Sequence, residues 1–141
     1  MKHSIFLFFL FALGACSSAP SLDGCYVGNV RQDTVFLSLT QEGTQVSGNL
    51  SYQFYERDQN SGSVQGEVLG DSLLLLDYTF MSEGMESNRQ VAFLHRDGKL
   101  IEGTGALKEQ EGGFAFEDIA QLNFGDAFQL NSTECSKVPQ P

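Results

Sequence analysis

Apolar and polar residues alternate along much of this chain with a repeat of two residues. Such alternation places successive side chains on opposite faces of an extended strand, so that one face is buried and the other is wet. The clearest runs cover residues 35–40, 46–55, 63–68 and 101–107. Antiparallel sheets with one buried face have this pattern. No window predicts a long helix, and residues 118–124 fit either a single helical turn or an irregular strand.

Turn-forming residues separate these runs. Asp, Asn, Ser, Glu and Gly concentrate at positions 32–33, 42–43, 58–62, 70–71, 82–87, 97–98 and 111–113. Connections this short do not make parallel crossovers, so neighbouring strands must pair antiparallel. The pattern therefore predicts an all-β domain at residues 24–135. We expect a single antiparallel meander of about eight strands that closes into a small barrel of the lipocalin or avidin kind.

Glycine recurs inside the predicted strands, at Gly28, Gly48, Gly66 and Gly103. Because glycine weakens a strand, we attribute these positions to the bending that barrel closure needs. A ligand cavity shaped by these small residues is the alternative interpretation. Closure also predicts that a last strand, at about residues 127–134, lies beside the first, at about residues 25–30.

One predicted strand is apolar on both of its faces. Leu74 and Leu76 are expected to face the core, together with the aromatic residues that follow them, while Leu73 and Leu75 point outward. Either the C-terminal segment covers these two leucines or they form an exposed contact patch.

The N-terminus has a different pattern. Lys2 and His3 precede a short apolar run, which ends in Leu13-Gly14-Ala15-Cys16. This order is typical of a signal peptide that is cleaved before a cysteine, which then receives lipid. We predict a signal peptide at residues 1–15, a lipidated Cys16 with a spacer at 16–23, and a loose tail at 136–141. The apolar run is far shorter than the roughly 20 residues of a spanning helix, so acyl chains such as palmitate are the expected anchor.

Two further cysteines, Cys25 and Cys135, bracket the predicted barrel. Such pairs form disulfides in the oxidising compartments to which proteins are exported, so we expect a disulfide that joins the first and last strands. A zinc site is the alternative. It is disfavoured because the two cysteines are far apart and His95 is the one histidine that remains after processing.

The chain is acidic. It carries 8 Lys and Arg against 18 Asp and Glu, a net charge of −10, and loss of Lys2 with the signal peptide makes this −11. Such a surface disfavours binding to nucleic acid or to bare anionic lipid. Acidity either keeps the tethered domain soluble or suits a basic protein partner.

Motifs of catalysis are not found in the sequence. It contains no phosphate loop, dinucleotide fingerprint, HExxH or GxSxG pattern. No spacing selects a nucleophile and an acid as partners for His95. We therefore expect no enzyme activity, catalytic residue, metal or cofactor.

Ligand binding at the barrel mouth is the remaining expectation. Residues 82–90 are either a solvated turn or a polar binding rim, since binding groups often occupy loops on a rigid scaffold. The candidate ligand-binding residues are aromatic, charged or imidazole side chains: Tyr52, Tyr78, Glu83, Glu86, Arg89 and His95.

Two resemblances refine this picture. The Leu13-Gly14-Ala15-Cys16 motif resembles the lipobox of bacterial lipoproteins, and residues 46–52, 77–84, 89–93 and 102–105, with Cys135, are similar to a group of small uncharacterised bacterial envelope lipoproteins. That group implies no activity. Its sorting rule retains lipoproteins with Asp after the lipidated cysteine at the inner membrane. Ser17 stands there, which implies an outer-membrane anchor, and the domain is expected to face the periplasm.

The second resemblance is to the periplasmic C-type lysozyme inhibitors, which are lipidated, disulfide-linked small barrels. Ser47, Gly48 and Tyr52 carry it, although this chain is longer and has no Trp. The sequence thus leaves two functions open. One is a non-catalytic envelope protein that binds a small apolar or amphipathic ligand at the barrel mouth. The other is a protein-binding module, such as an acidic inhibitor of a basic periplasmic hydrolase.

Overall fold

The computed structural model describes residues 20–57 and 59–139, and nearly all of their regular structure is β-strand. Two short 3₁₀ turns, η1 (Ile119–Gln121) and η2 (Cys135–Lys137), accompany the strands. The strands are β1 (Gly24–Val30), β2 (Asp33–Glu42), β3 (Gln45–Gln53), β4 (Gln59–Leu69), β5 (Leu73–Ser82), β6 (Met85–Arg96), β7 (Lys99–Gly103), β8 (Leu107–Gln110), β9 (Gly113–Phe116) and β10 (Gln129–Thr133).

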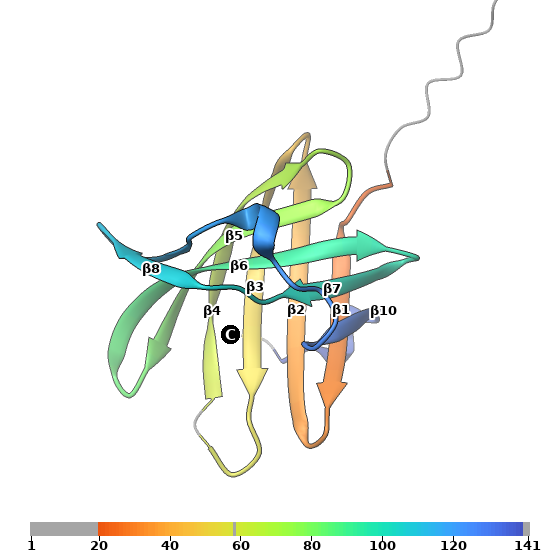
Figure 1. Ribbon diagram of the computed structural model, residues 1–141. Helices are drawn as coiled ribbons and strands as arrows, with labels where there is room; N and C mark the ends of the chain where they lie inside the picture. Colours follow the sequence, from red (N-terminus) through yellow and green to blue (C-terminus); the bar gives the residue numbers. More distant parts are fainter. Residues whose placement is uncertain (1–19, 58, 140–141) are drawn as a thin grey trace, which may run out of the picture.

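Eight of these strands close into an antiparallel barrel (Figure 1). Strands β1 to β7 pair in sequence order, and β10 then lies between β7 and β1. The predicted all-β fold and its closure through the last strand are confirmed. The difference from a simple meander is an excursion between β7 and β10. There β8 and β9 form a hairpin, which joins the barrel through a parallel pairing of Phe114 with Arg89 of β6.

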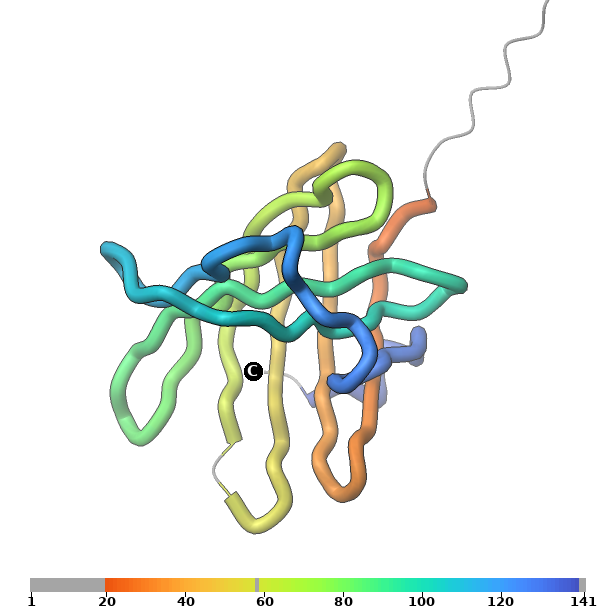
Figure 2. The backbone as a smooth tube through the Cα atoms, in the orientation of Figure 1, coloured from red at the N-terminus to blue at the C-terminus, as the bar shows by residue number. Residues whose placement is uncertain are grey.

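The antiparallel order gives the barrel two distinct ends. The end at which β1 begins also carries the β2–β3, β4–β5 and β6–β7 turns, and we call it the proximal end. The distal end carries the β1–β2 turn, the β3–β4 loop and the β5–β6 turn. The first two of these lie at the bottom of Figure 2.

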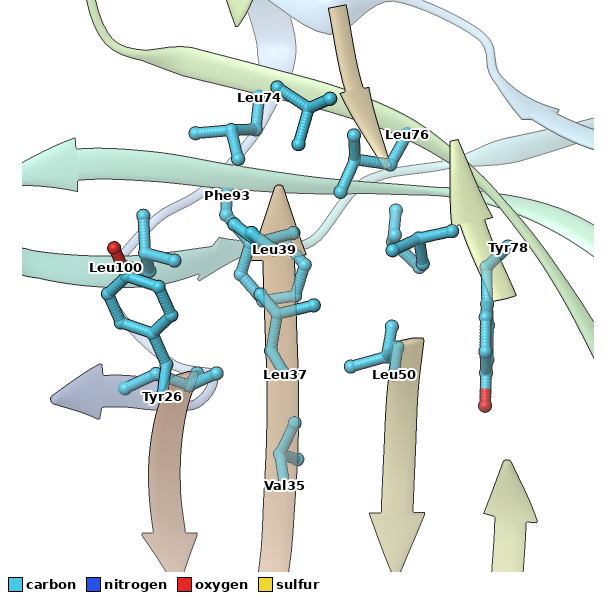
Figure 3. Packing of buried hydrophobic residues seen from close by; sticks show 14 of the residues in the cluster. Tyr26, Val35, Leu37, Leu39, Leu50, Leu74, Leu76, Tyr78, Phe93 and Leu100 are labelled. Carbon is cyan, nitrogen blue, oxygen red and sulfur yellow. The ribbon is translucent and has the colours of Figure 1, made fainter. Parts of the chain in front are cut away.

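Side chains fill the barrel interior through its proximal half. Alternate residues of each strand point inward, as the sequence predicts, and Leu37, Leu50, Leu74 and Phe93 have no exposed surface (Figure 3). Leu22 closes this end: it is 4% exposed, although the sequence placed it in the spacer. Its carbonyl accepts a hydrogen bond from the hydroxyl of Tyr26 at 3.1 Å. In the part of the chain that the structure describes, this filled core therefore excludes a deep apolar cavity along the whole barrel.

Interior glycines allow the strands to approach one another closely. A Cβ atom on Gly48 would lie 1.7 Å from the Ser38 carbonyl oxygen, and one on Gly66 would lie 2.1 Å from that of Leu75. No side chain fits at such distances. These glycines serve strand approach and curvature, which is the first of the two interpretations that the sequence allowed.

The predicted disulfide is present. Cys25 and Cys135 are bonded, with their Cα atoms 5.1 Å apart and a sequence separation of 110. Cys25 pairs with Thr133 across the β1–β10 ladder, so the bridge lies beside the contact that closes the barrel.

β7 is buried on both of its faces. Leu100 belongs to the core inside the barrel, and Glu102 points to the same side. Ile101 and Gly103 lie on the outer face, where the ring of Phe124 covers Gly103. The sequence pattern gave the opposite assignment, because it took Ile101 and Gly103 as the core face of this strand. Leu73 and Leu75 are half-buried on the outside of β5.

Several predictions concern residues outside the described ranges. The signal peptide at 1–15, the lipidated Cys16 and the first part of the spacer are among them. Within the described residues, no helix has the length and apolar character needed to cross a bilayer. Within the predicted tail, the turn η2 includes Lys137, and Val138 borders a hollow beside Phe36 of β2.

Candidate functional site

Four polar side chains meet inside the distal half of the barrel. Tyr52 comes from β3, Tyr78 from β5, Arg89 from β6 and Glu102 from β7. Each belongs to the inward-facing set of its strand, and Tyr78 is paired directly with Arg89 in the β5–β6 ladder. We call these four residues the interior polar cluster.

Tyr52 and Glu102 are joined directly. The Tyr52 hydroxyl donates a short hydrogen bond to a carboxylate oxygen of Glu102, and only 2% of Tyr52 is exposed. Burial raises the pKa of Glu102 above its ordinary value, although the Tyr52 hydrogen bond and the Arg89 charge oppose that shift. Burial, followed by the Glu102 charge, raises the pKa of Tyr52 well above its usual range. Tyr52 therefore remains a neutral donor.

Arg89 lies against the face of Tyr52. Its guanidinium carbon is 5.6 Å from the centre of that ring, which is within the range of a cation–π contact. This contact stabilises the positive charge of Arg89 without using one of its N–H donors. Within the described residues Arg89 has no ion-pair partner, and its buried Nε atom has no hydrogen-bond acceptor.

Tyr78 is the second group without a partner. It has no exposed surface, yet its buried hydroxyl makes no hydrogen bond within the described residues. Burial raises its pKa, while the positive charge of nearby Arg89 opposes the shift. Buried polar atoms are nearly always paired in proteins, because an unpaired one costs roughly 1–3 kcal/mol. Two such atoms on directly paired residues therefore point to a missing partner.

Aromatic rings surround the cluster. Phe54 is stacked on Tyr52, with 5.9 Å between the ring centres, and Phe80 is stacked on Tyr78, with 4.6 Å between them. Phe128 meets Tyr52 edge-on, with its ring centre 6.1 Å from that of Tyr52. All three are partly buried against the core. The polar groups thus lie in apolar surroundings, where charges and hydrogen bonds act more strongly than in water.

Two hollows reach this end of the barrel. The larger, of about 360 Å³, is open and lies at the rim between the β1–β2 turn and the β3–β4 loop. It is lined by Arg31, Gln32, Asp33, Phe54, Tyr55 and Arg57. Binding pockets for small molecules typically have about 300–1,000 Å³, so this hollow is at the lower end of that range.

The smaller hollow, of about 120 Å³, lies between β6 and β7, and its lining includes Arg89 and Glu102. It forms because β6 and β7 pair only as far as Ala92 and Gly103, beyond which β7 turns away and Arg89 pairs with Phe114 instead. Its lining combines the two charged groups with apolar side chains, including Val91, Leu107 and Phe116. We regard it as the chemically defined site, since the rim hollow has no buried charge in its lining.

The structure brings together three of the six ligand-binding candidates predicted from the sequence, namely Tyr52, Tyr78 and Arg89. Glu83 lies in the β5–β6 turn and Glu86 at the start of β6, and both are exposed at the distal end. His95 is half-buried near the proximal end, where its backbone N–H donates to the Ser72 carbonyl. A role for these last three in ligand binding stays a prediction.

Glu102 is the site residue that sequence reasoning missed. The alternation of residues 101–107 assigned it to the wet face, beside Thr104. A signal was available in Leu100, which is fully buried and two residues away on the same face as Glu102. With Leu100 taken as the inward residue, the strand period of two places Glu102 inside.

The arrangement is equipped for recognition. Arg89 and Tyr78 offer unpaired N–H and O–H donors, and the surrounding rings exclude water. Within residues 20–57 and 59–139, no group of three or more His, Cys, Asp or Glu side chains is placed to hold a metal ion. No protein-family model, curated protein or solved structure matches this chain.

Proposed function

We propose that this chain is a non-catalytic, lipid-anchored protein of the bacterial envelope that binds a small amphipathic ligand at the distal end of its barrel. The observation that carries the proposal is the pair of buried, unpartnered polar atoms, Tyr78 Oη and Arg89 Nε, within a ring of aromatic side chains. A ligand that supplies an acceptor to both would remove the cost of leaving them unpaired.

The position of the site suits an anchored protein. The described chain reaches the barrel at the proximal end, where Leu22 packs, and the interior polar cluster lies toward the opposite end. If Cys16 carries the lipid, the distal end faces away from the bilayer. The outer membrane, with the domain in the periplasm, is the location that we propose, because Ser17 follows the cysteine.

The filled proximal core limits the size of the ligand. A long acyl chain along the barrel axis would have to displace Leu37, Leu50 and Leu74, each of which is fully buried. A ligand at the rim has a hollow of about 360 Å³ beside Phe54 and Tyr55. The proposed ligand is therefore small, with an apolar part against these rings.

Native mass spectrometry of the full chain, purified in mild detergent from the envelope that makes it, tests the proposal. We expect a retained small molecule that denaturation releases. The neutral probe N-phenyl-1-naphthylamine should gain fluorescence with wild type and lose most of that gain with Phe54→Ala. Phe36→Ala is the matched control, because Phe36 is half-buried on the outside of β2. Protein that carries no adduct and leaves the probe dark would refute ligand binding at the mouth.

A second function is favoured by charge. The net charge is −10, and the β8–β9 hairpin with the residues after it exposes Glu109, Glu111, Glu117 and Asp118. β8 is also the free edge of the sheet. We therefore keep an acidic, inhibitor-like protein-binding module as the alternative. Binding to a basic lysozyme that weakens steeply between low and high salt would support it, and no binding at low salt would eliminate it.

A further inference from the structure

The hollow between β6 and β7 has the properties of a subsite for one negatively charged group. We propose that it binds the oxyanion head of a short amphipathic molecule, a carboxylate or a phosphate monoester, through Arg89 of its lining. The hydroxyl of Tyr78, which lies outside the lining and opposite Arg89 in the β5–β6 ladder, is the second donor. This inference rests on the proposed function in taking the ligand to be small and amphipathic. The inference adds the sign of the charge on the ligand, the residues that bind the charged group, and the route by which the ligand enters.

Arg89 lies beside a ring that is itself held in place. Its guanidinium carbon is 5.6 Å from the centre of the Tyr52 ring, and the hydroxyl of Tyr52 is held in turn by Glu102. A guanidinium group is planar and directs its N–H donors outward in that plane. Its Nε–H and a neighbouring Nη–H form a fork that matches the two oxygens of a carboxylate or phosphate. The buried Nε of this fork has no acceptor.

Tyr78 provides a third donor on the same face of the sheet. It stands directly opposite Arg89 in the ladder, is fully buried, and has an unpaired hydroxyl. A neutral phenol beside a cation favours an anion over a cation as the missing partner. The one acidic group in the cluster, Glu102, already accepts the Tyr52 hydrogen bond.

The walls of the hollow account for the apolar part. Arg89, Gln90, Glu102 and Thr104 form its polar lining, whereas Val91, Leu107 and Phe116 are apolar. Leu107 is 37% exposed, so the apolar lining extends to the surface. A volume of about 120 Å³ has room for several waters or for a short chain, and not for a long acyl chain. The head would lie at Arg89 and the tail along these side chains toward solvent.

Calorimetric titration of the full chain in detergent with four six-carbon probes tests the inference: hexanoate, hexyl phosphate, hexanol and hexylamine. Hexanoate or hexyl phosphate should bind, and whichever binds more tightly identifies the head group. Hexanol and hexylamine should bind at least about tenfold more weakly, because charge-assisted hydrogen bonds are worth roughly 1.5–3 kcal/mol.

Variants connect the effect to named residues. Arg89→Met should weaken binding of the preferred anion by roughly 10- to 100-fold, and Tyr78→Phe, which removes only the hydroxyl, by roughly 2- to 10-fold. Arg96→Met is the matched control, since Arg96 is an exposed arginine at the far end of the same strand. It should leave binding unchanged.

The outcomes separate this inference from the proposed function. Equal binding of hexanol and hexanoate, or an anion effect that survives Arg89→Met, would overturn the oxyanion subsite. N-phenyl-1-naphthylamine binding that persists in either case keeps ligand binding at the mouth. Anion binding that requires Arg89 in a protein that does not bind the neutral probe would support the subsite and refute the mouth.

Discussion

The disulfide between Cys25 and Cys135 should contribute a large part of the stability of the barrel. It joins residues that are 110 apart in sequence, and nearly the whole described domain lies inside the loop that it closes. In the chain-entropy treatment, a cross-link of this span lowers the conformational entropy of the unfolded chain, which stabilises the folded state by about 4.8 kcal/mol at 25 °C. Domains of this size have a total stability of about 5–15 kcal/mol.

Replacing both cysteines with alanine should therefore lower the free energy of unfolding by about 4–5 kcal/mol. For a chain of this length, that is a fall in Tm of roughly 15–20 °C. The native ladder should survive, because Cys25 stands opposite Thr133 and Ser38 in backbone ladders whose hydrogen bonds do not need the sulfur. Guanidinium unfolding, followed by circular dichroism with and without reductant, measures the difference.

The control is the response to reductant. Wild type should lose the same stability on reduction, while the Cys25→Ala/Cys135→Ala double variant should not respond. The entropic account also predicts that folding slows, because the ends of the chain must then meet without a tether. A stability difference below about 1 kcal/mol, or a reductant effect of equal size in the double variant, would refute this reasoning.

Three further predictions follow from buried groups. The pKa of Glu102 is raised in the folded state, so the folded protein binds the extra proton and stability falls as pH rises above 4.5. Glu102→Gln should therefore gain stability over wild type as pH increases through that region, as measured by thermal unfolding, and an advantage that is constant with pH would contradict this. Tyr52 and Tyr78 also have raised pKa values, so stability should fall above pH 10, and tyrosinate absorbance at 295 nm should rise as the barrel unfolds. Early titration of these two tyrosines without unfolding would show that their burial is weaker than we infer. Gly48→Ala should cost about 3 kcal/mol or prevent folding, because its Cβ would collide with a backbone carbonyl, whereas Gly125→Ala, which meets only a side-chain oxygen at 3.3 Å, should cost below about 1 kcal/mol in denaturant unfolding.

The barrel was predictable because its sequence signals are local and consistent. Val35, Leu37 and Leu39 alternate with residues that point outward, and the turns between strands are short. Antiparallel pairing then follows from connection length, and closure follows from the need to cover sheet edges. The pairing of Cys25 with Cys135 was predictable for the same reason, since closure brings the first and last strands together.

The site was only partly predictable, because its residues depend on a long-range contact. Both faces of β7 are buried, and Phe124 covers Gly103 on the outer face from a segment that returns about 20 residues later. Alternation based on Ile101 and Gly103 took this covered face as the core face, so it assigned Glu102 to solvent. The hydrogen bond from Tyr52, fifty residues away in sequence, then fixes Glu102 inside the barrel.

The excursion between β7 and β10 connects the fold to the proposed function. Without it, β7 would continue alongside β6 past Ala92, its backbone would pair with that of Arg89, and the wall would be closed there. With it, β7 turns away, β9 takes the vacated position beside β6, and a hollow of about 120 Å³ is left between them. The same excursion supplies Phe124, which covers the outer face of β7 at Gly103, while Glu102 on the inner face accepts the hydrogen bond of Tyr52 beside the guanidinium group. One departure from the simple meander thus creates the opening and its apolar wall at Leu107 and Phe116. For this reason we place the ligand at the interrupted wall and the distal rim, and not within the filled core.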